Sequence, residues 1–468
     1  MQHVFQHKIT DANRKNVKQK LLNWVVLTKN QLMKFIKEPI NKFIKLETSS
    51  SIVLFTATIL ALLLANSAIG DQFLGFWKNQ ITISIPGLEL SKPVIKWIND
   101  GLMVIFFFLI GLEIKRELIA GELNDFKKAS LPMFAAIGGM IFPAAIFTLL
   151  NYGKPGAEGW GIPIATDIAF TLGLLHLLGK RVPVGLKVFL MAFAIIDDLG
   201  AVLVIAFFYS SNIAWNYLGI ALGLIAFLFF FTWRGYYSKY LFFTISLIVW
   251  VLFLKSGIHA TIAGVLLAFT IPLRRKTKSA IFISEVKESL SIFENDCNKQ
   301  KDKLLLTKDQ LSAIDDIQEV SEKTAAPLQY LEHSLHGWVS YLIMPLFAFA
   351  NAGVVFNFGH NFNFDLITNI AISMILGKAI GIFTFSFLSI KLKISEMPQN
   401  VNLKMLAGIS ILGGLGFTMS LFINNLAFTD QALIDSAKMG ILIGSVITGI
   451  LGYLVLRLNL INAKEKGK

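Results

Sequence analysis

Long apolar segments separated by short polar connections make up most of the chain, and this pattern predicts a polytopic membrane protein. A run of about 20 apolar residues is long enough for an α-helix to cross the hydrocarbon core of a bilayer. Twelve segments approach this length, at 51–69, 101–118, 130–150, 160–178, 185–209, 215–233, 238–254, 257–273, 337–356, 366–390, 405–427 and 436–457. The sequence therefore predicts an all-α fold with twelve transmembrane helices, numbered here as spans 1 to 12.

The loop charges predict how these spans are oriented. Lys and Arg follow spans 2, 4, 6, 8 and 10, whereas the loops after spans 5 and 9 contain neither residue. Cytoplasmic loops of membrane proteins collect Lys and Arg. The basic loops and both chain termini are therefore expected to be cytoplasmic, which agrees with an even number of spans.

The spans divide the chain into five parts with different compositions. These are a basic cytoplasmic N-terminal segment (1–47), spans 1–8 (48–276), a charged cytoplasmic insertion (277–335), spans 9–12 (336–458) and a cytoplasmic tail (459–468). Residues 1–47 carry ten Lys and Arg against three acids, interspersed with apolar residues such as Leu22 and Phe35. An amphipathic segment on anionic lipid headgroups and a disordered basic tail both fit this composition.

Two regions outside the spans have patterns of their own. In residues 80–91, apolar residues alternate on either side of Pro86-Gly87, which predicts a short β-hairpin on the periplasmic face. This hairpin would cover a loop or join two subunits. In the insertion, Thr307 and Gln310 have capping-box spacing, so a helix is expected to start there. We favour a solvent-exposed helical segment without catalytic chemistry over a regulatory element.

The composition excludes several classes of protein. With 54% hydrophobic residues, the 468-residue chain is no ordinary soluble domain. Its net charge of +13 need not indicate nucleic-acid binding, because basic cytoplasmic loops account for such an excess. The single cysteine, Cys297, provides neither a disulfide framework nor a zinc site, and no cofactor is expected.

Two spans contain residues that interrupt a helix. Pro163, Thr166 and Asp167 lie within span 4, and three glycines within 413–416 lie in span 11. These spans are the middle members of the triplets 3–5 and 10–12. Broken helices at matching positions predict inverted-topology repeats with a binding site near the bilayer midplane. Close helix packing is the alternative explanation for the glycines alone.

The pair Asp197-Asp198 lies in the middle of span 5. Each Asp near a bilayer centre costs roughly 2.5 to 3.5 kcal/mol on insertion scales, so the pair needs a cation, a proton or a partner. Neighbouring side chains on a helix diverge by about 100°, so one aspartate would bind an ion while the other pairs with Lys378 of span 10. Carboxylates and the Thr166 hydroxyl suit Na⁺ or Li⁺, and protons would compete for these oxygens.

Asp167 and Lys378 have a second possible role at the helix breaks. The ends of a helix carry partial charges of roughly +0.5 and −0.5. Asp167 would neutralise the positive ends, and Lys378 the negative ones. For Asp167, this structural role and direct ligation of a cation both remain open.

Further titratable residues are candidates for pH sensing. They are Glu113, His259, Glu332, His333 and His336. Glu113 ends span 2, and the last three open span 9, all on the expected cytoplasmic face, where they would attract cations and titrate. Ordinary helix-end charges, and hydrogen-bonded packing for His259, are the alternatives.

Several sequence motifs resemble the bacterial NhaA-type Na⁺/H⁺ antiporters. They are WINDGLM (97–103), GLEIKREL (111–118), IATDIAF (164–170), AIIDDLG (194–200), KSGIHAT (255–261), PLFAFANAG (345–353) and GLGFTMS (414–420). The resemblance runs from about 46 to 458, apart from the insertion. It implies crossed, interrupted helices in spans 4 and 11 and alternating access across the bacterial inner membrane. This family is itself a known inverted-repeat transporter.

The resemblance also implies roles for individual residues. Asp198 matches the principal ion-binding and proton-carrying carboxylate, Asp197 the carboxylate that pairs with a lysine, and Lys378 that lysine. Thr166 and Asp167 match the helix crossing. The expected Na⁺ ligands are Asp198, Asp197 and Thr166. The implied function is electrogenic, pH-regulated export of Na⁺ or Li⁺ in exchange for protons, for sodium and pH homeostasis. Homodimers formed through the periplasmic hairpin are also implied.

Two other functions would use buried carboxylates. An intramembrane aspartyl protease needs two aspartates that converge on one water, usually from different helices, whereas these two are consecutive. A passive cation channel needs a continuous pore, and broken helices favour a site that opens alternately. We therefore expect a transporter and no enzyme. The insertion and the long N-terminus depart from the family pattern, so its pH set point cannot be transferred.

Overall fold

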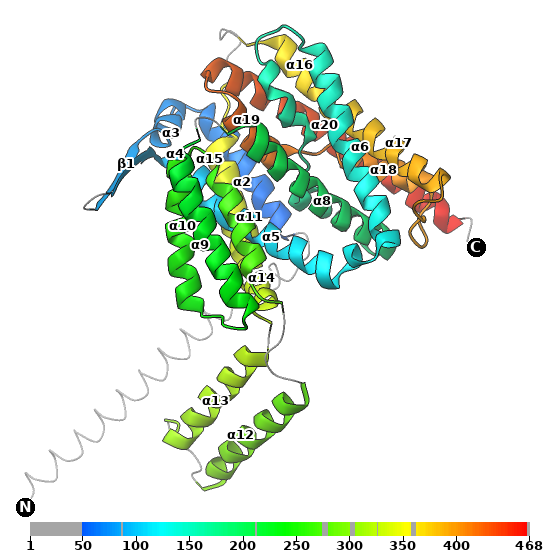
Figure 1. Ribbon diagram of the computed structural model, residues 1–468. Coiled ribbons are helices and arrows are strands. Elements are labelled where there is room, and N and C mark those ends of the chain that lie inside the picture. Colours follow the sequence, from blue (N-terminus) through cyan, green and yellow to red (C-terminus); the bar gives the residue numbers. More distant parts are fainter. Residues whose placement is uncertain are drawn as a thin grey trace, which may run out of the picture.

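The computed structural model describes residues 49–85, 88–210, 213–273, 279–299, 305–324, 326–356 and 362–465. The basic segment 1–47, the Pro86-Gly87 turn and residues 466–468 lie outside this part of the chain. Figure 1 shows a helical bundle from which a pair of helices projects.

The first half of the chain forms helices and one two-stranded sheet. Its elements are α2 (Ser49–Ala65), α3 (Gly70–Phe76), β1 (Gln80–Ile85), β2 (Leu88–Pro93), α4 (Val94–Trp97), η1 (Ile98–Leu102), α5 (Met103–Ala120), η2 (Glu122–Asn124), α6 (Phe126–Leu150), η3 (Ala157–Ile164), α7 (Ile168–Leu177), η4 (Gly179–Arg181), α8 (Val184–Phe208), α9 (Trp215–Trp233), α10 (Lys239–Ser256) and α11 (Ala260–Thr270). Gly257, which has a φ of +79°, ends α10 in a left-handed conformation that glycine adopts at little cost.

The second half is helical throughout its described residues. Its elements are α12 (Ser279–Lys299), α13 (Lys308–Thr324), α14 (Pro327–Trp338), η5 (Val339–Ile343), α15 (Met344–Asn351), α16 (Phe364–Ile372), η6 (Ser373–Gly377), α17 (Lys378–Lys391), α18 (Leu403–Leu412), α19 (Phe417–Ala427) and α20 (Gln431–Glu465). The elements η1, η5 and η6 are π-helical turns. Such turns displace neighbouring side chains and often occur at functional sites.

Many of these helices are long and apolar enough to cross a membrane. Seven qualify in the described part of the chain, and the bent pair α18 and α19 makes an eighth if it forms one span. The helical membrane protein predicted from the sequence is thus confirmed. The count is lower than twelve because other expected spans contain short elements, such as α11, which has eleven residues.

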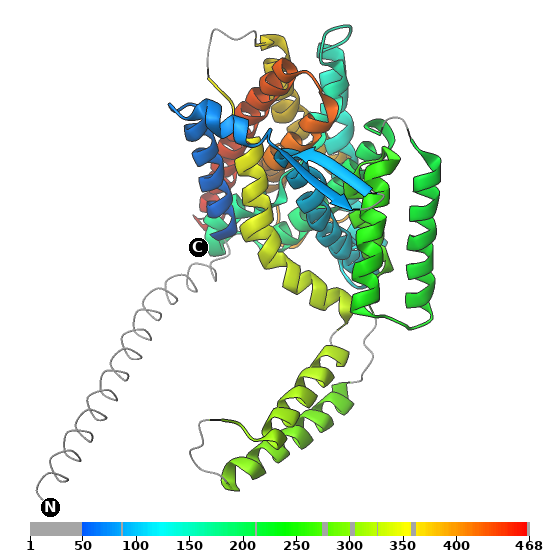
Figure 2. The same ribbon diagram turned by 90° about the vertical axis from the view of Figure 1, so that its left-hand side faces the viewer.

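The bundle has two flanks on either side of the buried α8 and α19. Figures 1 and 2 show α9 and α10 side by side on one flank, while α6 and α17 pack together on the other. Gly138 of α6 and Gly381 of α17 meet at the closest point, where a Cβ on either glycine would overlap the carbonyl oxygen of the other. This close crossing brings Lys378, the first residue of α17, into the centre of the bundle.

The two regions outside the bundle adopt the predicted structures. Strands β1 and β2 pair antiparallel from Gln80 opposite Pro93 to Ile85 opposite Leu88, which confirms the hairpin. In the insertion, the Thr307 N–H donates to Gln310 Oε1 at 3.1 Å, and the Gln310 N–H donates to Thr307 Oγ1 at 3.2 Å. This reciprocal capping box confirms the helix start. The α12–α13 hairpin projects away from the bundle in both views.

Candidate functional site

Two non-helical segments meet in the middle of the bundle. Residues 165–167 separate η3 from α7, and residues 413–416 separate α18 from α19, which are bent by 43° relative to each other. The Asp167 N–H donates to the Leu415 carbonyl at 2.7 Å, and the Thr166 hydroxyl donates to the Gly413 carbonyl at 2.8 Å. These bonds satisfy backbone groups that water cannot reach at this depth.

Gly416 permits the close approach of the two segments. A Cβ at this position would lie 2.6 Å from the Ala165 carbonyl oxygen, which is too close for any side chain. The glycines of 413–416 therefore do more than end a helix, since at least one of them is required by the crossing itself.

Asp167 caps two helices at this crossing. Its carboxylate accepts from the Phe170 N–H at 3.1 Å at the start of α7, and from the Thr418 N–H at 2.9 Å at the start of α19. It also accepts a hydrogen bond from the Thr418 hydroxyl. Helix N-termini attract negative charge. Of its two possible roles, these contacts favour charge compensation over cation ligation.

Lys378 forms a buried ion pair with Asp197. Its ammonium nitrogen lies 2.9 Å from Oδ1 and 2.7 Å from Oδ2 of Asp197, and 2.9 Å from the Thr166 hydroxyl oxygen. Both side chains of the pair are 0% exposed. The aromatic ring of Phe193 lies 5.8 Å from the ammonium. Lys378 thus contacts side chains in this cluster rather than the carbonyl ends of the broken helices.

Asp198 differs from its neighbour in having no such partner. It is 1% exposed, and within the described part of the chain neither carboxylate oxygen accepts a hydrogen bond. An ionised carboxylate that is buried without a partner is costly. Among the described residues, Asp198 is therefore the carboxylate of this cluster that no neighbouring side chain compensates by a hydrogen bond or ion pair.

Three of the pH-sensing candidates lie on α14, and one of them contacts α5. Glu332 accepts from Arg116 with N–O distances of 3.0 Å to both carboxylate oxygens. Glu113 lies one helical turn earlier on α5 and is half-buried. His333 and His336 are exposed to solvent. The structure thus brings Glu332 to Arg116, near the end of α5.

His259 lies at the start of α11, apart from the other candidates. Its Nε2 is 2.9 Å from the carbonyl oxygen of Tyr209, which follows the last residue of α8. The Tyr209 hydroxyl accepts from the Gly161 N–H at 3.0 Å and donates to the Glu158 carbonyl at 2.9 Å. His259 therefore contacts the end of the helix that carries the aspartates, without reaching the aspartates themselves.

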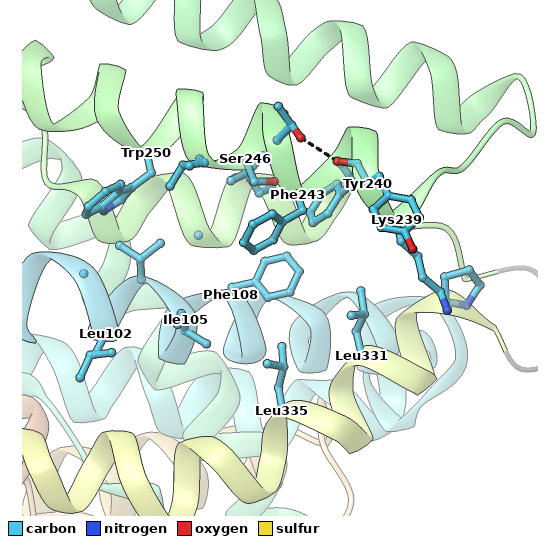
Figure 3. A pocket seen from close by; sticks show the side chains of 18 of the residues that line it. Leu102, Ile105, Phe108, Lys239, Tyr240, Phe243, Ser246, Trp250, Leu331 and Leu335 are labelled. Atoms are coloured by element: carbon cyan, nitrogen blue, oxygen red, sulfur yellow. Dashed lines mark hydrogen bonds between the residues drawn. The ribbon is translucent and has the colours of Figure 1, made fainter. Parts of the chain in front are cut away.

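A large cavity lies elsewhere in the bundle. It has a volume of about 1170 Å³ and lies between α5, α10 and α14. Figure 3 shows aliphatic and aromatic side chains around it, with Trp250 towards one end and Lys239 towards the other. Because its walls are largely apolar, this cavity is poorly suited to a small cation, and the candidate site remains the crossing.

The described residues contain no group of three or more His, Cys, Asp or Glu side chains placed to hold a metal ion. A cation at the crossing would therefore be bound by few charged groups.

One contributor to the site was missed in the sequence. Thr418 donates two hydrogen bonds to Asp167, although in the sequence it stands out only as part of the GLGFTMS motif. Its position in the first turn after a break was the available signal, since hydroxyls there commonly bond to nearby polar groups.

Buried charges at a crossing of interrupted helices are typical of ion-coupled membrane transporters. The comparisons with known proteins identify the family. The chain matches the family model described as "Na+/H+ antiporter 1" over residues 41–456, and it belongs to that family.

Individual relatives agree with this assignment. The chain is 46% identical over 432 residues to the Na(+)/H(+) antiporter NhaA of Oleidesulfovibrio alaskensis, covering 92% of this chain and 96% of the relative. It is 43% identical to NhaA of Bacteroides thetaiotaomicron, over 92% of this chain and 100% of the relative. The chain is also 43% identical to NhaA 2 of Helicobacter hepaticus, over 92% of this chain and 98% of the relative.

Proposed function

We propose that this protein is a secondary active antiporter that exports Na⁺, and also Li⁺, in exchange for protons across the bacterial inner membrane. Membership of the Na⁺/H⁺ antiporter 1 family supports Na⁺/H⁺ exchange. The structural observation that supports it most strongly is Asp198, a carboxylate that is buried and lacks a hydrogen-bond partner among the described residues.

The geometry suggests how one site serves two ions. Asp198 holds either a proton or Na⁺, and each ion displaces the other because both compensate the same buried charge. Asp197 and the Thr166 hydroxyl are engaged by Lys378 at 2.7 to 2.9 Å. They become Na⁺ ligands only when Lys378 releases them. Electrogenic exchange, in which more protons than Na⁺ move per cycle, is what membership of the family implies.

The architecture we propose has twelve spans with both termini in the cytoplasm. Spans 4 and 11 are the interrupted helices formed by η3 with α7 and by α18 with α19, and they belong to two inverted repeats. Alternating access would then expose the crossing to either side in turn. The β1–β2 hairpin would lie in the periplasm and join two copies into a homodimer.

The pH dependence is assigned to groups outside the crossing. Glu113, Glu332, His333 and His336 lie at the proposed cytoplasmic end, and His259 lies near the end of α8. These groups would affect the access or the stability of the bundle without supplying an ion ligand. The insertion 277–335 is assigned an accessory role.

Proteoliposomes with a pH-sensitive dye inside test this function. Adding Na⁺ outside should move protons across the membrane with the wild-type protein, and Asp198→Asn should abolish the flux while leaving the protein folded. Asp365→Asn is the matched control, because Asp365 is exposed and pairs with Lys154 on the surface. Normal exchange by Asp198→Asn would refute the proposal, whereas Na⁺ flux without proton counterflow would indicate a channel.

A further inference from the structure

The projecting α12–α13 hairpin exposes side chains on either side of the contact between its two helices. A buried seam holds the helices together, and it includes Val286, Ser289, Ala313 and Ile317. At about 100° per residue, one set of exposed side chains lies on each side of this seam. The hairpin therefore presents a face that no other described element covers.

One of these faces combines carboxylates with apolar side chains. On α12 it carries Glu285 and Glu288 together with Ile281 and Ile292, of which the isoleucines are 47% and 43% exposed. On α13 it carries Asp309 and Asp316, which are seven residues apart and both exposed. Viewed from the N-terminus of each helix, both sets are rotated in the same direction from the buried seam. Because α12 and α13 run antiparallel, the two sets lie on the same face of the hairpin. We call this surface the acidic face.

The charge of the acidic face is unusual for this chain. Helix α12 has four acidic and two basic residues, and α13 has five acidic and two basic residues, in a protein with a net charge of +13. No described residue forms an ion pair with Glu285, Glu288, Asp309 or Asp316. A surface of net negative charge attracts a partner of complementary charge.

The chain itself contains a segment of complementary composition. Residues 1–48 carry ten Lys and Arg against three acids, interspersed with Leu22, Val25, Phe35 and other apolar residues. Basic and apolar residues in one segment match the carboxylates and isoleucines of the acidic face. This segment precedes α2, so the position of α2 determines where it joins the bundle.

Segment 1–48 joins the bundle at the end from which the hairpin projects. The Ser49 hydroxyl hydrogen-bonds to the Tyr341 hydroxyl in η5, whereas Asn66, beyond the other end of α2, donates to the Val354 carbonyl at 2.7 Å. Helix α2 thus runs alongside η5 and α15 in the same direction, so its first residue, Ser49, lies at the end where η5 follows α14. Figure 2 shows the hairpin projecting from the same end of the bundle.

The distance is within reach of this segment. Helix α14 and η5 separate Tyr341 from the base of the hairpin by about 15 residues, or roughly 22 Å at the helical rise of 1.5 Å per residue. Forty-eight residues would span roughly 70 Å even at that short rise. Because the segment is covalently joined to α2, its effective concentration near the hairpin is also high.

We propose that the acidic face of α12–α13 is the docking site for the basic segment 1–48 of the same chain. Several exposed ion pairs, each weak alone, act together with burial of Ile281 and Ile292. This contact would connect the N-terminus to α14, whose Glu332 pairs with Arg116 of α5. It does not depend on the proposed transport function, and an anionic membrane surface is the competing partner for segment 1–48.

Amide hydrogen exchange of the full-length protein in phosphatidylcholine nanodiscs tests the docking. Amides of 1–48 should exchange about tenfold more slowly than in an unstructured chain. Glu285→Lys/Asp316→Lys should remove this protection. The matched control, Glu294→Lys/Asp315→Lys, makes the same charge change at exposed positions outside the acidic face and should retain it.

Further measurements keep the test decisive if the first variant unfolds the hairpin. With the wild-type protein, raising the KCl concentration to about 1 M, where the Debye length is about 3 Å, should remove the protection of 1–48. Deleting residues 1–40 should accelerate exchange in α12 and α13. The proposal is overturned if both double variants behave alike, or if protection of 1–48 appears only when phosphatidylglycerol is added to the bilayer.

Discussion

The helix crossing and the α12–α13 hairpin both contain carboxylates, but their surroundings differ. Asp167, Asp197 and Asp198 at the crossing are at most 1% exposed, whereas Glu285, Glu288 and Asp316 on the hairpin are exposed to solvent. Water solvates an exposed carboxylate, so its charge costs little free energy, whereas a buried carboxylate needs a specific partner. A substitution should therefore have a large effect at the crossing and a small effect on the hairpin.

The largest loss of stability is expected for Lys378→Ala. It leaves Asp197 buried without its partner, and breaking such a pair typically costs about 3 to 5 kcal/mol. The thermal unfolding temperature in detergent should fall by several degrees, together with any loss of transport. Lys154→Ala is the control, because its pair with Asp365 is exposed and is worth at most about 1 kcal/mol. Equal effects of both variants would show that burial does not distinguish the two pairs.

An intermediate effect is expected for Thr418→Val, which keeps the shape of the side chain but removes the hydroxyl donor to Asp167. A hydrogen bond to a charged group contributes about 1.5 to 3 kcal/mol. Stability should fall by about that amount in chemical denaturation. Thr384→Val, whose hydroxyl bonds only to carbonyl groups of its own helix at an exposed position, should cost less. If the two variants are equally stable, the hydrogen bond from the Thr418 hydroxyl to Asp167 does not stabilise the crossing.

The smallest effect on exchange is expected when the hairpin is removed. Replacing residues 279–325 with a short flexible linker should preserve the fold and exchange at optimal pH, because the hairpin supplies no group to the crossing. The pH threshold should move, since α14 with Glu332, His333 and His336 follows directly. Rates in proteoliposomes over a range of pH measure this. A variant that binds Na⁺ but exchanges nothing at any pH would make the hairpin part of the transport machinery.

Much of the fold follows from local patterns in the sequence. Apolar runs predicted the helices, and alternation around Pro86-Gly87 predicted the β-hairpin, because each depends on residues close together in the chain. The number of spans did not follow as directly. Among the described residues, seven helices, or eight with the bent pair, are long and apolar enough to cross a membrane, whereas α2 and α11 are apolar but shorter.

The site was partly visible in the sequence. Charges in apolar spans mark Asp197, Asp198 and Lys378 because such residues are costly in a bilayer. Helical geometry separates the two aspartates, but it does not say which of them faces Lys378, since that depends on how α8 rotates against α17. The contact between Thr418 and Asp167 joins residues 251 positions apart, and only the crossing of two spans brings them together.

Proton release on Na⁺ binding tests most directly whether Asp198 exchanges one ion for the other. Purified protein in weakly buffered detergent solution is titrated with NaCl while a pH indicator is recorded, with choline chloride as the control for ionic strength. The wild-type protein should release protons with a saturable dependence on Na⁺, and Asp198→Asn should release none, whereas Asp365→Asn should behave like the wild type. Undiminished release by Asp198→Asn would contradict the account, because the proton that Na⁺ displaces would then come from another group.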